Sequence, residues 1–187
     1  MRIRKAIYED ARAIAEVLFF AMEEIIYTFI REHNSEKAVD FLYYFVQDVN
    51  NQYSYQNCWV VEGERSEIMA AACVYDGASL YRLREKVLTH IKEGYGDLPF
   101  VMEDETEIGE FYIDSIGVNP VHRGKGIGTI LLKFLIEEYV EKQQQTLGLL
   151  VEEENTNAKR LYLKMGFKPI RTKFFAQKVM VQLQIKP

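Results

Sequence analysis

The stretch that decides the fold reads IGVNPVHRGKGIGT and covers residues 116–129. It joins a segment of strand character, residues 111–118, to a strongly amphipathic helical pattern that runs from residue 126 to about residue 142. The turn between them contains three glycines within five residues, which are Gly124, Gly126 and Gly128. Because glycine has no side chain and adopts positive φ angles, such a turn lets a ligand approach the backbone closely.

The position of this turn at the start of a helix indicates what it binds. A helix N-terminus presents unpaired N–H groups and a partial positive charge, both of which suit a phosphate group. Arg123 and Lys125 add positive charge to the same turn. The residues therefore predict a loop that binds a diphosphate.

Two common nucleotide loops do not fit the spacing. A Walker A loop needs glycine where Asn119 stands and serine or threonine where Gly126 stands. The dinucleotide fingerprint needs another glycine where Thr129 stands. Both alternatives are therefore disfavoured.

The spacing instead fits Arg-x-x-Gly-x-Gly, read from Arg123, Gly126 and Gly128, and so resembles the acyl-CoA pyrophosphate loop of the GNAT N-acetyltransferase superfamily. A second block, NTNAKRLYLKMGF at residues 155–167, is similar to the family signature Asn-x-x-Ala-x-x-Leu-Tyr-x-x-x-Gly-Phe. Residues 3–11 resemble the family's first strand and helix. The order of these elements extends the resemblance over nearly the whole chain.

This resemblance implies a mixed α/β (α+β) fold of the GNAT type, with a central, mostly antiparallel sheet of six or seven strands flanked by helices. We expect residues 1–187 to form one domain, with an excursion at about residues 77–107 that is either a solvated cover over one end of the sheet or a lid that faces substrate. The patterns also predict helices that begin after Asp10 and at Ser35, each of these two residues being a candidate N-cap. The remaining expected elements are a strand at 3–7, a hairpin over 59–75, a strand at 147–151, a helix at 157–165 and two strands within 167–185.

Composition narrows the class of protein. The chain has 187 residues, of which 48% are hydrophobic and 27% charged, values that exclude a disordered or collagen-like protein. Its net charge of −5 disfavours a nucleic-acid-binding protein. The three histidines show no metal-ligand spacing, so no metal is expected.

The cysteines and the apolar segments bear on location. Cys58 and Cys73 are too few for a disulfide framework and too far apart in sequence for a zinc or redox motif, which favours a reduced, cytoplasmic setting. The N-terminus lacks the apolar stretch of a signal peptide, and no apolar run is long enough to span a bilayer. We therefore expect no association with membranes.

The resemblance assigns residues to the cosubstrate acetyl-CoA. It implies that Arg123, Gly124, Gly126, Gly128 and Thr129 hold the pyrophosphate, mainly through backbone N–H groups, whereas Lys125 either joins them or is a solvated charge. It further implies that the strand ending at Val118 carries a bulge and diverges from the strand at residues 147–151. Ile116 and Val118 would then give backbone contacts to the pantetheine arm. Asn155 would bind pantetheine, act as a helix N-cap, or do both.

Acetyl transfer from a thioester to an amine also needs an acid and a base. The resemblance implies that Tyr162 is the general acid for the leaving thiolate, although its place on an apolar helical face also fits ordinary core packing. Glu110, Tyr112 and Asp114 alternate along a strand and share one face if that strand is regular. Glu110 is the first candidate for the base and Asp114 the second; a surface carboxylate is the alternative for Glu110.

We therefore expect an N-acetyltransferase that moves the acetyl group of acetyl-CoA to a primary amine of a small molecule, peptide or protein, by direct attack in a ternary complex. The alternative is a non-catalytic acyl-CoA-binding sensor or assembly module. Homodimers are common among similar proteins, so a homodimer is compatible with the resemblance. The acidic runs at residues 103–107 and 152–154 either attract a cationic acceptor or are simply solvated.

Overall fold

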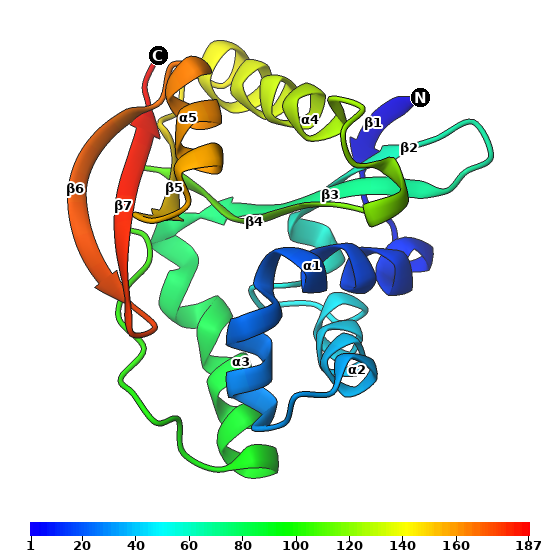
Figure 1. The fold of residues 1–187 in the computed structure, drawn as a ribbon, viewed down its shortest axis with the longest axis vertical. Helices are drawn as coiled ribbons and strands as arrows, with labels where there is room; N and C mark the ends of the chain where they lie inside the picture. Colours follow the sequence, from blue (N-terminus) through cyan, green and yellow to red (C-terminus); the bar gives the residue numbers. More distant parts are fainter.

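The computed structural model describes residues 1–187, which form a seven-stranded sheet in the order β1-β2-β3-β4-β5-β7-β6 (Figure 1). Neighbouring strands are antiparallel except β4 and β5, which are parallel. The strands are β1 (Arg2–Lys5), β2 (Cys58–Glu62), β3 (Ile68–Asp76), β4 (Phe111–Val118), β5 (Leu147–Glu152), β6 (Lys168–Phe175) and β7 (Lys178–Ile185). The predicted mixed, mostly antiparallel sheet is confirmed.

Helices cover both faces of this sheet. The first three helices lie on one face, and the last two lie on the other (Figure 1). They are α1 (Ala11–Ile30), α2 (Ser35–Val46), α3 (Leu80–Tyr95), α4 (Ile127–Leu135), which a π-helix (Ile136–Lys142) continues, and α5 (Thr156–Lys164). Short 3-10 turns occur at Tyr8–Asp10, Tyr55–Asn57, Gly77–Ser79 and Pro120–His122.

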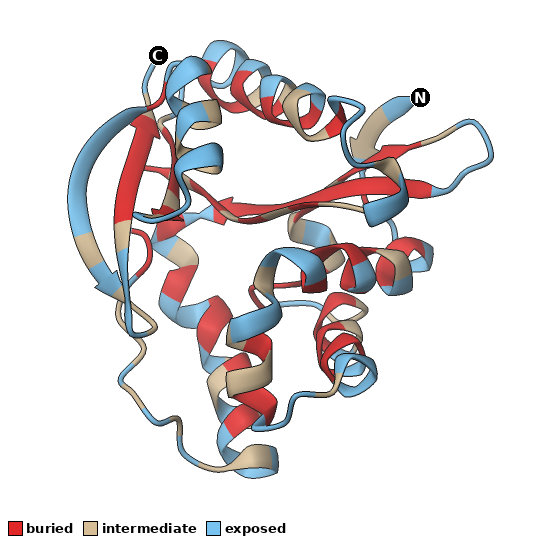
Figure 2. Cartoon of the chain, viewed as in Figure 1, coloured by how far each residue is buried: buried red, intermediate tan, exposed pale blue.

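The core has two parts, one on each side of the sheet (Figure 2). The central strand β3 is buried on both faces, which explains its nearly continuous apolar sequence. Its side chains alternate between the two parts: Ala71 and Cys73 face α1, α2 and α3, whereas Ala70 and Ala72 face α4. The sheet therefore separates two sets of helices, and β4 lies next to β3 at the centre.

The predicted N-caps of the first two helices are met only in part: Asp10 stands at the N-cap position of α1 but its side chain makes no capping hydrogen bond, and Ser35 is not the N-cap of α2. Asn34, not Ser35, caps α2, and its side chain accepts a hydrogen bond from the N–H of Lys37 at 3.0 Å. Asp10 has helical backbone angles because it closes the preceding 3-10 turn. Its carboxylate accepts from the N–H of Ile7 at 2.9 Å and pairs with Arg4. A capping residue needs non-helical backbone angles, a condition that Asn34 meets and Asp10 does not.

The excursion at residues 77–107 contributes to the core as well as to the surface. Leu83, Val87 and Ile91 of α3 are buried in the same cluster as α1 and α2. The apolar stripe of α3 thus faces inward and is covered by other helices, while the opposite face of the helix is exposed.

Residues 97–107, here named the strap, run back from α3 and dock on the β6–β7 hairpin. Arg171 pairs with Glu107 at 2.7 Å, Lys173 donates to the carbonyl of Asp104 at 3.0 Å, and the N–H of Ala176 donates to Glu103 at 3.2 Å. The acidic run at residues 103–107 is therefore engaged with the hairpin rather than simply solvated.

Helix α1 approaches β4 very closely at one point. A Cβ atom on Gly117 would lie 2.4 Å from the carbonyl oxygen of Val17, so only glycine fits there. Beyond this contact α1 bends at Met22, whose φ of −128° and ψ of 15° are not helical. The second half of α1 therefore turns away from the sheet and toward α3 (Figure 1).

We expect Gly117→Ala to lower the free energy of unfolding by about 1–3 kcal/mol, because the added methyl group forces α1 away from β4. Gly94→Ala is the control, since a Cβ atom there meets nothing within 4 Å. Gly94 lies within α3, so that change should leave stability unchanged or raise it by up to about 1 kcal/mol. Urea denaturation of both variants measures the difference, and equal effects would contradict the close approach.

Candidate active site

The site forms where β4 and β5 part. The two strands pair only over residues 111–113 and 147–149, and they separate beyond these positions. On its other side β4 carries a bulge: Cys73 pairs with Ser115 and Val74 with Ile113, which leaves Asp114 as an extra residue. The bulge and the divergence that the family resemblance implies are both present.

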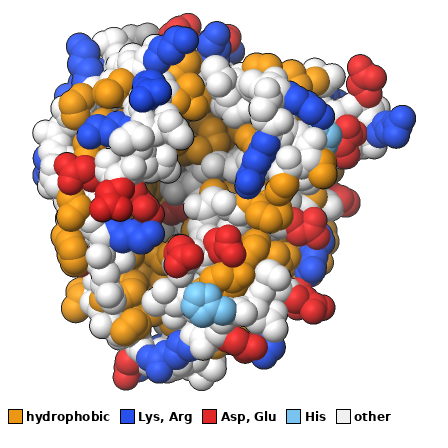
Figure 3. All heavy atoms as spheres, viewed as in Figure 1, with side chains coloured by type: hydrophobic (Ala, Val, Ile, Leu, Met, Phe, Trp, Pro, Cys, Tyr) orange, Lys and Arg blue, Asp and Glu red, His pale blue; other side chains and the backbone are white.

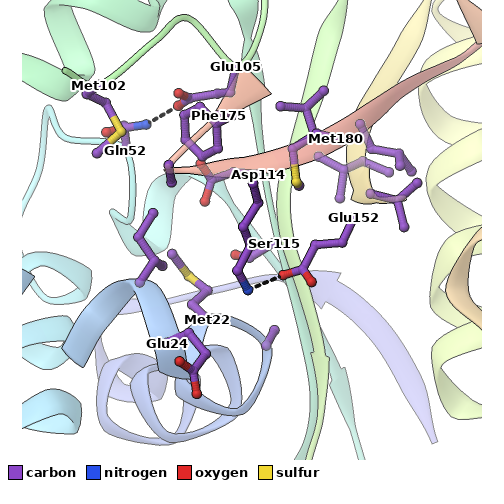
Figure 4. A pocket seen from close by; sticks show the side chains of 18 of the residues that line it. Met22, Glu24, Gln52, Met102, Glu105, Asp114, Ser115, Glu152, Phe175 and Met180 are labelled. Carbon is purple, nitrogen blue, oxygen red and sulfur yellow. Dashed lines mark hydrogen bonds and ion pairs between the residues drawn. The ribbon is translucent and has the colours of Figure 1, made fainter. Parts of the chain in front are cut away.

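A cavity of about 780 Å³ lies where β4 and β5 diverge. Figure 3 shows the molecular surface hollowed near its centre, and Figure 4 shows the side chains inside. The lining is mostly hydrophobic and comes from β4, β5, α1, α3, α5, the strap and the tip of the β6–β7 hairpin. Four of the residues that the sequence singled out line it, which are Asp114, Ile116, Asn155 and Tyr162.

The glycine loop lies beside this cavity, at the start of α4. The N–H groups of residues 124–129 donate to no acceptor within the chain. Gly124 and Gly126 have φ angles of 75° and 76°, and a Cβ atom on either would meet nothing within 4 Å. This row of unpaired donors in open space at a helix N-terminus fits a diphosphate group.

The charged side chains of the loop fold back on the protein. Arg123 donates to the carbonyl of Val118 at 3.3 Å, and its guanidinium lies 5.5 Å from the ring centre of Phe20. Lys125 donates to the carbonyl of Val121 at 3.2 Å. The backbone N–H groups are therefore the donors that the loop presents to a ligand.

The backbone of β4 offers further unpaired groups toward the opening. The N–H of Asn119 donates to the carbonyl of Met69 in β3 at 2.9 Å. Because hydrogen bonds alternate along an antiparallel pair, Gly117 also faces β3, whereas the N–H and C=O groups of Ile116 and Val118 point away from β3. Of these groups, the C=O of Val118 already accepts from Arg123. These two residues can pair with an extended amide-containing ligand.

A buried polar network lies at the floor of the cavity (Figure 4). The hydroxyl of Tyr75 donates to Glu105 at 3.0 Å and lies 3.4 Å from Oδ1 of Asp114. Gln52 donates to Glu105 at 2.7 Å and to the Tyr75 hydroxyl at 3.1 Å. Arg84 pairs with the other carboxylate oxygen of Glu105. The strap, α3, β3 and β4 thus meet in one network.

The environment of Asp114 changes its acidity. Burial raises the pKa of Asp114 to about 7, and the nearby carboxylate of Glu105 raises this pKa as well. Burial also raises the pKa of Glu105, which Arg84 opposes. The Oδ2 atom of Asp114 and the hydroxyl of Ser115 are buried without a hydrogen-bond partner in the chain. Asp114 can therefore exchange a proton near neutral pH.

Glu110, the first candidate for the base, lies outside the cavity lining. It is buried, and its carboxylate accepts hydrogen bonds from Thr106 at 2.7 Å and Gln184 at 2.7 Å. Gly148 makes room for it, since a Cβ atom there would lie 1.9 Å from the carboxylate. The alternative expectation of a surface carboxylate is also wrong, because Glu110 ties the start of β4 to its neighbours. Asp114 is the carboxylate of this row that reaches the cavity.

Tyr162 and Asn155 reach the cavity from α5 and its N-terminus. The Tyr162 hydroxyl has no hydrogen-bond partner in the chain, and burial raises the pKa of this phenol to about 12. Asn155 caps α5, its side chain accepting from the N–H of Ala158 at 3.1 Å. The N-cap expectation for Asn155 is therefore confirmed.

Sequence reasoning missed the polar network that reaches Asp114 through Tyr75, whose other members are Gln52, Arg84 and Glu105. One signal was available: Arg84 interrupts the apolar face of α3 at helical spacing from Leu80 and Val87. A charged residue on a buried face needs a buried partner of opposite charge. The sequence does not say which of the acidic residues of the strap supplies that partner.

Comparison with known proteins shows the family to which the chain belongs. The model of the acetyltransferase (GNAT) family matches residues 21–167. The chain therefore belongs to the acetyltransferase (GNAT) family.

Solved structures extend the likeness over the whole chain. A crystal structure described as an acetyltransferase is 28% identical, with a TM-score of 0.79 over 100% of this chain and 99% of that one. An N-acetyltransferase from Staphylococcus aureus Mu50 is 23% identical, with a TM-score of 0.84 over 99% of this chain and 100% of that one, and shows the same fold.

Two curated relatives match only part of the chain. A [ribosomal protein bS18]-alanine N-acetyltransferase of Haemophilus influenzae is 39% identical over 66 residues, which are 35% of this chain and 44% of the relative. A mycothiol acetyltransferase of Gordonia bronchialis is 34% identical over 65 residues, which are 35% of this chain and 20% of the relative. The chain thus matches less than half the length of either relative.

Two further observations concern metal ions and membranes. No group of three or more His, Cys, Asp or Glu side chains is placed so that it can hold a metal ion. None of the helices combines the length and apolar character that crossing a membrane requires.

We expect Arg84→Met to lower the free energy of unfolding by about 3–5 kcal/mol, because it leaves the carboxylate of Glu105 buried without its cation. The double variant Arg84→Met/Glu105→Gln should recover part of this loss. Lys92→Met, on the exposed face of the same helix, is the control and should change stability by less than about 1 kcal/mol. Urea denaturation measures all three; a small effect of Arg84→Met would show that the pair is not buried in solution.

Proposed function

We propose that the protein is an N-acetyltransferase that moves the acetyl group of acetyl-CoA to a primary amine by direct attack in a ternary complex. The main support for this proposal is the placement of backbone and side-chain groups where β4 and β5 diverge. There a row of unpaired loop N–H groups lies beside a cavity lined by both Asp114 and Tyr162. Family membership supports the use of acetyl-CoA.

The chain provides a binding surface for each part of the cosubstrate. The N–H groups of residues 124–129 would hold the pyrophosphate, with Thr129 at the end of this row. Arg123 and Lys125 add charge and would swing out from their backbone partners to reach it. Ile116 and Val118 would pair with the amides of the pantetheine arm, and Asn155 lines the cavity beside them. The acetyl group would then lie at the parting, near Asp114.

Asp114 is proposed as the general base. A free primary amine has a pKa near 10.4, so most of it enters as ammonium at neutral pH. The carboxylate of Asp114 has a pKa of about 7 and its Oδ2 has no partner in the chain, so it can accept a proton from the amine once the amine is desolvated. Glu105 and Tyr75 hold Asp114 in place without filling this position.

Tyr162 is proposed as the acid for the leaving sulfur. Its pKa of about 12 keeps the phenol protonated at neutral pH, and no group in the chain competes for its hydrogen bond. A thiolate of pKa near 8.5 gains from a nearby donor as its charge develops. Asp114 takes the first proton from the ammonium, and the N–C bond then forms as the C–S bond breaks and Tyr162 gives its proton to sulfur. The second proton that nitrogen loses restores the Tyr162 hydroxyl, and the proton on Asp114 passes to solvent.

A binding and turnover experiment tests the proposal. We expect the wild-type protein to bind acetyl-CoA in isothermal titration and to release thiol when an amine is added. Tyr162→Phe should keep the same affinity for acetyl-CoA and lose turnover, by about 10²-fold or more, because the sulfur loses its donor. Binding of acetyl-CoA without turnover on any amine would favour a non-catalytic acyl-CoA-binding module, and unchanged turnover would remove Tyr162 from the acid role.

The pH dependence tests the base. Because Asp114 must be deprotonated to act, kcat/KM should rise about tenfold per pH unit below pH 7 and level off above it. Asp114→Asn should lower kcat/KM by about 10²- to 10⁴-fold and remove this limb from the profile. Asp97→Asn, an exposed strap residue, should keep the wild-type profile. A limb that persists in Asp114→Asn would assign the base to another group.

A further inference from the structure

We propose that the acceptor is a small monoamine whose primary amino group is carried on an apolar body, with the amine at Asp114 and the body against the outer wall of the cavity. The proposal rests on the proposed function, and it concerns the part of the cavity that the N-terminal helices, the strap and the hairpin tip line. Four elements make up that wall: the bend of α1, the face of α3, the strap and the hairpin tip.

The wall is apolar along its length. It carries Met22 and Ile25 from the bend of α1, Val87 from α3, Met102 from the strap, and Phe175 and Met180 from the hairpin (Figure 4). Because α1 bends at Met22, the helix from that residue onward changes direction and contributes residues to the cavity lining. Flexible methionines on three different elements can adapt to an apolar group of varied shape.

The charge inside the cavity fits a single ammonium. Of the carboxylates that line it, Glu105 is paired with Arg84, and Glu152 with Lys178 at 2.6 Å. Asp114 is the acidic group at the floor that has no cation, and one of its oxygens has no partner at all. Glu23 and Glu24 also line the cavity, but both are exposed to solvent on α1. A second ammonium held along the wall, short of these two exposed carboxylates, would be desolvated against methionine and phenylalanine side chains.

The border of the cavity favours a small molecule over a peptide. The strap is fixed to the hairpin by the three contacts of Glu103, Asp104 and Glu107. The pair between Glu152 and Lys178 joins β5 to the hairpin tip on the other side (Figure 4). These contacts hold the strap and the hairpin tip in place beside α1 and α3, which limits the space on the acceptor side that an extended chain could occupy.

A series of amines tests the inference. We expect kcat/KM at saturating acetyl-CoA to be about tenfold higher for n-hexylamine than for n-butylamine, because each buried methylene contributes about three- to fourfold. 2-Phenylethylamine should also be a good acceptor. 1,6-Diaminohexane should be at least about tenfold poorer than n-hexylamine, because its second ammonium loses hydration without gaining a partner.

A substitution in the apolar wall, with a control substitution at the adjacent residue, gives a second test. Met102→Glu puts a carboxylate into the wall and should lower kcat/KM for n-hexylamine while raising it for 1,6-diaminohexane. Val101→Glu is the matched control, since Val101 is the adjacent residue, is 82% exposed and does not line the cavity. It should leave both values unchanged.

Calorimetric titration of the same amines into the protein with free coenzyme A gives the order of affinities without turnover. If no amine is acetylated but the affinities follow this order, the proposed function fails, and only the preference of the cavity for an apolar monoamine is retained. A preference for 1,6-diaminohexane or spermidine, or an affinity that does not depend on chain length, would overturn the inference. Efficient acetylation of a lysine-containing peptide with none of the small amines would overturn it as well.

Discussion

The parting of β4 from β5 after Ile113 and Leu149 is the constraint on which the site depends. A continued parallel ladder would pair the backbone of Ile116 with β5 and leave no opening between the strands. The bulge at Asp114 bends β4 at this point and turns an extra side chain toward the opening. Gly117 then lets α1 press against β4 from the other side, which fixes the strand that carries the site. One local irregularity thus exposes backbone groups and places a carboxylate beside them.

The buried pair of Arg84 and Glu105 is the second element of this arrangement. Neither charge is favourable in the interior alone, so the pair joins α3 to the strap at the floor of the cavity. Through Tyr75 it also positions Asp114. The same strap lines the cavity with Met102 and docks on the hairpin. Its Glu105, in the network that reaches Asp114, and its Met102, in the acceptor wall, therefore belong to one segment.

Much of the fold followed from local patterns. The strand at residues 111–118 coincides with β4, and the loop, α5 and the last two strands lie where periodicity and the two motifs placed them. The errors fall where a residue's role depends on which partner its side chain meets in the folded chain. Asp10 pairs with Arg4 instead of capping a helix, and Glu110 is held by Thr106 and Gln184 instead of facing the cavity. Arg4 and Thr106 lie close in sequence to their partners, and Gln184 lies far from Glu110, but in each case the pairing depends on how the folded chain directs the side chains, which residue spacing does not encode.

The sequence by itself determined the family, the order of the elements and the diphosphate loop, because glycines at fixed offsets and apolar periodicity are local properties of the chain. The tertiary structure alone decided which carboxylate reaches the cavity and what lines the acceptor side. Burial sets the pKa of Asp114, and burial exists only once α3, the strap and β4 have met. The acceptor wall likewise combines segments from residue 22 to residue 180, so its chemistry exists only in the folded chain.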